Sequence, residues 1–216
     1  MTVRFKYDLA KDIENFFLVA KYSQQEFASP IRSRYEAQYG QELNTDKLRS
    51  FILAETKEQQ LDLNSVTNQY QRDWDFVNDE FFKRCERLFN CALPSDEIIA
   101  YLTLCDRCGY NIKNNYFFIS AKDNKPKLTT IHELWHFYTW HAFGQELQSL
   151  SPQDYYVLKE ALTVIINHEF KDLLDGYDTG LGSHQEIRRK IENMWLLHKD
   201  LSAVIDEFKK SFFNYR

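Results

Sequence analysis

Hydrophobic positions recur at helical spacing through the first half of the chain. In residues 9–22 the apolar side chains fall three and four positions apart, which predicts an amphipathic helix. Further helices are expected after Ser29-Pro30, after Asn44, and over a long segment from about residue 64 to residue 90, because capping residues precede each one. We therefore interpret residues 1–94 as an N-terminal helical region that acts as a scaffold or as a wall of the substrate cleft.

The pattern changes after residue 94. Residues 98–105 and 116–120 are rich in strand-forming side chains, and turn-forming residues lie between them, which predicts a hairpin-like pair. Helical spacing then returns at residues 127–143 and 151–176, and a capping box at 183–186 is expected to open a final helix. The expected fold class is α+β and mostly helical, with residues 95–216 forming one compact unit.

Composition supports a packed and helix-rich protein. Of 216 residues, 44% are hydrophobic and 16% aromatic, whereas only 6 are Gly and 4 are Pro, too few for a many-stranded sandwich or barrel. The formal net charge of -5, with acids interspersed among the bases, argues against a nucleic-acid partner. Signal-peptide and membrane-spanning patterns are absent, so a cytoplasmic protein with no membrane partner is expected.

The four cysteines do not form a convincing second metal site. Cys105 and Cys108 have the spacing of a redox or zinc pair, but Cys85 and Cys91 do not match it. In a chain without a secretory signal, reduced thiols are the simpler expectation.

One motif carries recognisable chemistry, and it lies on the helix expected at 127–143. His132 and His136 are four positions apart, so their imidazoles project from the same face about 40° apart and can share one metal ion. Glu133 lies beside them, where it can act on water without being a ligand. The alternative interpretation is a chance match, with Thr130 and Glu133 forming a capping box at a helix start.

The order of strand, polar loop and motif helix resembles the zincin metallopeptidases. In those enzymes an edge strand runs along the cleft beside the metal-binding helix. The resemblance implies a zincin-like core, with residues 116–120 as the edge strand to which an extended peptide could add. It covers about half of the chain, from Glu97 to the C-terminus, and leaves out the N-terminal helices.

A catalytic zinc ion needs a third protein ligand. His141 is expected to point away, because it is about 140° around the helix from His136. Glu160 is the better candidate, since a carboxylate within an apolar run of the next helix is costly to bury without a compensating charge. The reserve candidates are His168, Glu169 and Asp154.

The segment around Glu160 resembles the thermolysin-like gluzincins, whose third ligand is a Glu followed by a similar run of residues. Two positions depart from that pattern, with Lys159 in place of an Asn and Val164 in place of an Asp. In the family that Asp orients the first metal histidine, so here another group must do so. The matching stretch is Glu160-Ala161-Leu162-Thr163.

The resemblance implies a zinc-dependent metallopeptidase that hydrolyses peptide bonds. Glu133 would take a proton from a zinc-bound water and pass it to the leaving amine, while Tyr177 or His184, or else Arg188, would stabilise the oxyanion. Two other functions stay open. The chain could be a catalytically inactive zincin-fold protein that binds or regulates a partner, or a helical protein with an accidental motif. The sequence indicates neither the substrate specificity nor the oligomeric state.

Overall fold

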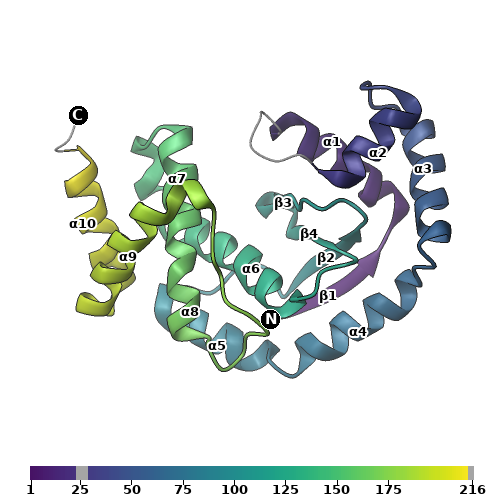
Figure 1. Ribbon diagram of the computed structural model, residues 1–216. Coiled ribbons are helices and arrows are strands. Elements are labelled where there is room, and N and C mark those ends of the chain that lie inside the picture. The colour runs from purple at the N-terminus through teal and green to yellow at the C-terminus, as the bar shows by residue number, and fades with distance from the viewer. Residues whose placement is uncertain (23–28, 214–216) are drawn as a thin grey trace. The chain divides into compact units, whose positions relative to one another are not determined.

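The computed structural model describes residues 1–22 and 29–213, which form a mostly helical chain with one small sheet (Figure 1). The chain divides into two compact units, each built from two segments. The first comprises residues 1–78 and 95–126, and the second comprises residues 79–94 and 127–216. These units do not coincide with the ranges 1–94 and 95–216, because each range contributes to both.

The first unit contains a four-stranded mixed sheet in the order β1-β2-β4-β3. Strand β1 (Thr2–Tyr7) runs parallel to β2 (Glu97–Thr103), with Thr2 opposite Glu97 and Tyr7 opposite Leu102. Strand β4 (Tyr116–Ser120) is also parallel to β2, and the two-residue β3 (Tyr110–Asn111) pairs with β4 in the antiparallel sense.

The hairpin expected between residues 98–105 and 116–120 is therefore wrong, although both strands exist. The chain after β2 passes through β3 and a short 3₁₀ helix (Ile112–Asn114) and re-enters the sheet in the parallel direction. Four of the five β4 residues are buried, as is usual for a strand covered on both faces. Nor is β4 an edge strand over its first residues, because β3 pairs with Tyr116 and Phe117.

Strand β1 was not predicted, although its sequence alternates in the way that a half-buried strand requires. Val3 and Phe5 are buried, and they come between more exposed neighbours. The Gln71 side chain accepts a hydrogen bond from the Phe5 amide at 2.9 Å and donates one to the Val3 carbonyl at 3.0 Å. Gln71 thus binds the backbone of β1 on the side away from β2.

The remaining helices of the first unit largely follow the predicted capping signals. They are α1 (Leu9–Tyr22), α2 (Pro30–Tyr39), α3 (Thr45–Glu58) and α4 (Leu63–Asp75). Ser29 and Asn44 cap α2 and α3 as expected, accepting hydrogen bonds from backbone amides two or three residues on. The single helix expected over residues 64–90 is wrong, because α4 ends at Asp75 and α5 (Asn78–Phe89) begins after a turn.

A buried polar contact joins α1 to the end of β2. The Asp12 carboxylate accepts hydrogen bonds from the Thr103 hydroxyl at 2.6 Å and from the Leu104 amide at 3.1 Å. Burial raises the pKa of Asp12 to about 7, against the opposing effect of these hydrogen bonds. The Asp12 carboxyl is therefore a buried group of the first unit that titrates near neutral pH.

The second unit is helical. It contains most of α5 and then α6 (Pro126–Phe143), α7 (Pro152–Leu162), α8 (Ile166–Glu169), α9 (Gln185–His198) and α10 (Leu201–Phe213). The motif helix was predicted to within one residue. The helix expected at 151–176 is shorter, because a 3₁₀ turn (Thr163–Ile165) interrupts it and α8 ends at Glu169.

The last helix also differs from its prediction. The capping box at residues 183–186 does not form. Instead a 3₁₀ turn (Gly182–His184) leads into α9, and His184 occupies the N-cap position without a side-chain cap. Lys199, with a φ of 52°, then separates α9 from α10.

Aromatic side chains form the core of the second unit around α6. The Phe89 ring lies 4.7 Å from that of Trp135 and 5.2 Å from that of Tyr138, and Phe81 packs against Phe170 at 5.1 Å. Because α6 is buried on most of its surface, its few polar side chains lie in a poorly solvated environment. Within the described residues, no helix combines the length and the apolar character that crossing a membrane would require.

Candidate metal centre

Three predicted ligands come together in the second unit, from two different helices. His132 and His136 on α6 and Glu160 on α7 each offer a donor atom, and these atoms all lie within 4.8 Å of one another. The two Nε2 atoms are 3.1 Å apart. Glu160 Oε2 lies 3.4 Å from Nε2 of His132, and Glu160 Oε1 lies 3.4 Å from Nε2 of His136. The residues placed by the structure contain one such group of metal-ligating side chains.

Helix geometry accounts for the pairing of the two imidazoles. Their ring centroids are 4.7 Å apart and their planes are nearly perpendicular, at 85°. One turn of helix separates them, so both point to the same side of α6. The alternative in which Thr130 and Glu133 cap a helix start is wrong, because α6 begins at Pro126 and both residues lie inside it.

Asp178 orients the first histidine, and the sequence analysis missed it. Its Oδ2 lies 2.9 Å from Nδ1 of His132, and because a carboxylate can only accept, Nδ1 of the imidazole carries a proton. That leaves Nε2 of His132 facing Glu160 and His136. Asp178 thus fills the role that Val164 cannot, but from a loop 46 residues away in the chain.

Asp178 is itself held in place by several buried contacts. Asn167 forms two hydrogen bonds with its backbone, at 2.8 and 2.9 Å, and the Gly180 amide donates to its Oδ1 at 2.8 Å. Arg188 donates to the Asp178 carbonyl at 2.7 Å and to Oδ1 at 3.3 Å. No periodicity or spacing signal in the sequence indicates this arrangement.

Arg188 has a positioning role in the structure. Besides its contacts with Asp178, it donates through Nη1 to the Thr163 hydroxyl at 2.7 Å and to the Glu160 carbonyl at 3.1 Å. It is only 3% exposed. One guanidinium therefore joins the backbone of Glu160 to the carboxylate that orients His132, which differs from the oxyanion role considered for Arg188.

Burial and neighbouring charges shift the pKa values of the motif residues in different directions. Burial opposes protonation of His132, but the hydrogen bonds to Asp178 and Glu160 outweigh it and raise its pKa to about 10. Burial and the Lys159 charge together lower the pKa of His136 to about 3. The Glu160 pKa is lowered, because the charge and hydrogen bonds of the histidines outweigh its burial.

Glu133 has the environment expected of a general base. It is 8% exposed, and burial raises its pKa to about 7. In the part of the chain that the structure describes, its Oε2 has no hydrogen-bond partner. A carboxylate with one unengaged oxygen and a pKa near neutrality can accept and release a proton at physiological pH.

A buried lysine adjoins Glu160, the predicted third ligand. The Lys159 side chain is 7% exposed, and its ammonium donates a hydrogen bond to Oε1 of Glu160. The same ammonium lies 4.8 Å from the centroid of the Tyr156 ring. Lys159 was noted in the sequence only as a departure from a family pattern, and nothing there indicated that it would be buried.

The other predicted site residues lie outside this group. Tyr177 is 57% exposed, next to Asp178 in the chain, whereas His184 is buried with its ring 5.8 Å from that of Tyr156. Their proposed role in stabilising an oxyanion stays a prediction. His141 is exposed, in line with its expected orientation.

None of the reserve ligands belongs to the donor group. Nε2 of His168 lies 2.7 Å from Oε1 of Glu192, and Oε1 of Glu169 accepts a hydrogen bond from the Trp195 indole at 3.2 Å. At the start of α7 the Ser151 hydroxyl donates a hydrogen bond to Oδ2 of Asp154 and accepts one from the Asp154 amide, so Asp154 belongs to the helix cap.

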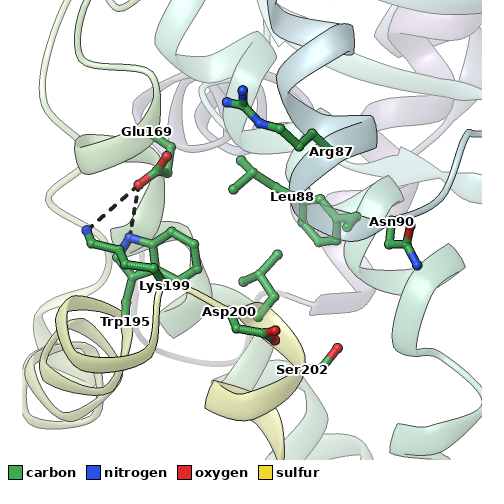
Figure 2. A pocket seen from close by; sticks show the side chains of 10 residues that line it. Arg87, Leu88, Asn90, Glu169, Trp195, Lys199, Asp200 and Ser202 are labelled. Atoms are coloured by element: carbon green, nitrogen blue, oxygen red, sulfur yellow. Dashed lines mark hydrogen bonds and ion pairs between the residues drawn. The ribbon is translucent and has the colours of Figure 1, made fainter.

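A cavity of about 510 Å³ lies elsewhere in the second unit and is lined by one of the reserve ligands, Glu169 (Figure 2). In it Glu169 contacts both Trp195 and Lys199, as the dashed lines of Figure 2 mark. Its lining includes none of the three metal donors. The residues that line it are Arg87, Leu88, Phe89, Asn90, Glu169, Trp195, Lys199, Asp200, Leu201 and Ser202.

Comparison with known proteins adds no relative. No protein-family model, no curated protein and no solved structure matches the chain.

Proposed function

We propose that this protein is a zinc-dependent metallopeptidase of the gluzincin type, with a zincin-like core around α6 and α7. The observation that carries the proposal is the convergence of His132, His136 and Glu160, with donor atoms within 4.8 Å of one another. The motif predicted the two histidines, whereas Glu160 was predicted from its place in an apolar run of the following helix.

The donor set suits zinc. Two imidazole nitrogens and one carboxylate oxygen are the ligands of many catalytic zinc sites, which keep a further position for water or substrate. The His132 side chain is 23% exposed, so one side of the group is accessible to solvent. Asp178 supplies the carboxylate–histidine contact that commonly accompanies such ligands. When bound, zinc would act as a Lewis acid on the scissile carbonyl and make water more acidic.

The chain's own residues would then do the following. Glu133 takes a proton from the attacking water through a carboxylate oxygen and returns it to the amine that leaves. Asp178 keeps the His132 proton on Nδ1, so that Nε2 stays available. Arg188 holds Asp178 and the Glu160 backbone together. Tyr177 and His184 remain the predicted donors to the oxyanion, and a peptide is the expected substrate because of the resemblance to zincins.

The decisive experiment measures metal content and peptide hydrolysis on the same variants. Purified wild-type protein is expected to hold about one zinc per chain by mass spectrometry and to cleave members of a random peptide library. Glu133→Gln should keep the zinc and lose about 10²- to 10⁴-fold in rate, because only the proton carrier is removed. His136→Ala should lose both. The control is Glu186→Gln, since Glu186 is exposed and pairs with Lys190 at 2.9 Å.

The outcomes separate the alternatives. Zinc retention without hydrolysis by the wild-type protein would support the inactive zincin-fold protein that binds or regulates a partner. A wild-type protein that holds no zinc would contradict both, and would leave the motif as an accident of sequence.

A further inference from the structure

The metal centre contains a cation that zinc ligation does not require. The Lys159 ammonium donates to Oε1 of Glu160, and that oxygen is 3.4 Å from Nε2 of His136. Its charge also lowers the pKa of His136. The Lys159 ammonium therefore lies next to the proposed metal donors, although Lys159 follows the motif by more than twenty residues in the chain.

A buried ammonium at this point opposes metal binding more than it favours it. Burying a lysine is costly unless an opposite charge compensates it, and Glu160 does so here. The same carboxylate is the proposed third ligand, however, and a bound dication would have Lys159 as a neighbour of like charge. The lysine therefore weakens metal binding electrostatically, and its buried position beside Glu160 requires another explanation.

That explanation is the binding of an anion. With zinc, two neutral imidazoles and one carboxylate, the ligand sphere already carries a positive charge, and Lys159 adds a second. A site with this surplus stabilises negative charge on a bound molecule, and a fixed ammonium is a strong hydrogen-bond donor to an anionic oxygen. The flexible four-carbon stem of a lysine lets its ammonium move from one acceptor to another.

Neighbouring aromatic rings support this role. The Tyr156 ring lies 4.8 Å from the Lys159 ammonium and is 39% exposed, so it holds the cation by a cation–π contact at a position close to solvent. The buried His184 ring packs edge-on against Tyr156 at 5.8 Å. His184 can therefore act through Tyr156, as a positioning residue for the lysine.

We propose that Lys159 is a catalytic residue whose ammonium binds the anionic oxygen that develops on the substrate carbonyl. The inference rests on the proposed function and adds to it a charged donor to the oxyanion, beside the predicted donors Tyr177 and His184. The ammonium donates a hydrogen bond and keeps its proton, so no bond is formed or broken at Lys159.

The test uses the full-length protein loaded with cobalt(II), whose visible spectrum changes when an anion binds, and inorganic phosphate as the probe. Lys159→Met is expected to raise the dissociation constant for phosphate at least 10-fold, because a charged donor is lost. Zinc affinity, measured by competition with a chromophoric chelator, should stay the same or rise. With a cleavable peptide, kcat should fall about 100-fold or more, with KM little changed.

Two further variants make the result specific. Lys159→Arg keeps the charge and should recover most of the phosphate affinity. Lys190→Met removes a lysine of α9 that is 64% exposed, and it should change neither phosphate nor zinc affinity.

Two outcomes would overturn the inference. If Lys159→Met lowers zinc affinity and leaves phosphate affinity unchanged, the lysine only positions Glu160. If the wild-type protein binds neither cobalt nor zinc, the proposed function fails together with this inference, whereas the first outcome leaves the proposed function intact.

Discussion

The contact between Asp178 and His132 offers a sharp test, because Asp178→Asn replaces the one oxygen that faces the histidine. In Asp178→Asn the amide oxygen can keep the position of Oδ1, which accepts from the Gly180 amide at 2.8 Å and from Arg188 at 3.3 Å. The amide NH₂ group then replaces Oδ2, 2.9 Å from Nδ1 of His132. The substitution thus exchanges an acceptor for a donor at the histidine and keeps an oxygen for Gly180 and Arg188, although it removes the charge that pairs with Arg188.

The expected magnitude follows from the tautomer of the imidazole. An NH₂ group facing Nδ1 favours the tautomer with the proton on Nε2, the atom that faces Glu160 and His136. Zinc binding must then reverse that preference. Loss of such outer contacts typically costs 10- to 100-fold in metal affinity, or about 1.4–2.7 kcal/mol. We expect the zinc affinity of Asp178→Asn to fall within this range.

The assay is competition with a chromophoric zinc chelator, with circular dichroism to verify the fold. Asp175→Asn is the matched control, because Asp175 lies in the same loop but accepts from the Lys127 and Leu128 amides at the start of α6, at 2.9 Å each. It should leave zinc affinity unchanged. The reasoning would be refuted if Asp178→Asn bound zinc as tightly as the wild-type protein, or if both variants lost affinity equally.

Two further predictions concern stability. Because the pKa of buried Asp12 is raised from 3.8 to about 7, the free energy of unfolding should fall by up to about 4 kcal/mol as the pH rises from 4 to 8, relative to Asp12→Asn. Urea denaturation at several pH values measures this difference, and Asp8→Asn, at an exposed position, is the control. The prediction would be contradicted if the free energy of unfolding changed equally with pH in the wild-type protein and in Asp12→Asn. Gly180→Ala should cost about 1–3 kcal/mol, since Gly180 has a φ of 59° and an added Cβ would lie 2.5 Å from Nη1 of the buried Arg188. Gly182→Ala, where an added Cβ has nothing within 4 Å, should be nearly neutral in the same urea assay, and equal stabilities would argue against strain.

Much of the candidate site could be predicted because its signals are local. The motif fixes the spacing of His132 and His136, and helical periodicity located the helix that carries them. Glu160 was found from the cost of burying a carboxylate in an apolar run. Each inference used residues within one or two helical turns of one another.

The residues that were not predicted are placed by tertiary structure, namely by the path of a loop or by the packing of a helix. Hydrophobic periodicity carries no information about either. Asp178 reaches His132 from a loop, and Lys159 turns inward beside Glu160 although a lysine on a helix is usually solvated. The fold shows the same limit. Strands 98–105 and 116–120 were recognised, but their parallel direction and the pairing of β2 with the distant β1 were not, because strand partners are set by tertiary contacts.

The second unit is built from two separate segments of the chain, so a single truncation cannot isolate it. Phe89 belongs to residues 79–94, yet its ring packs on Trp135 of the motif helix at 4.7 Å. A fragment that starts at residue 95 would retain every proposed ligand. It would lack Phe89, however, and would expose the side of α6 on which that ring packs. Such a truncation would favour aggregation, and isolating the candidate metal site requires joining residues 79–94 to residues 127–216 through a designed linker.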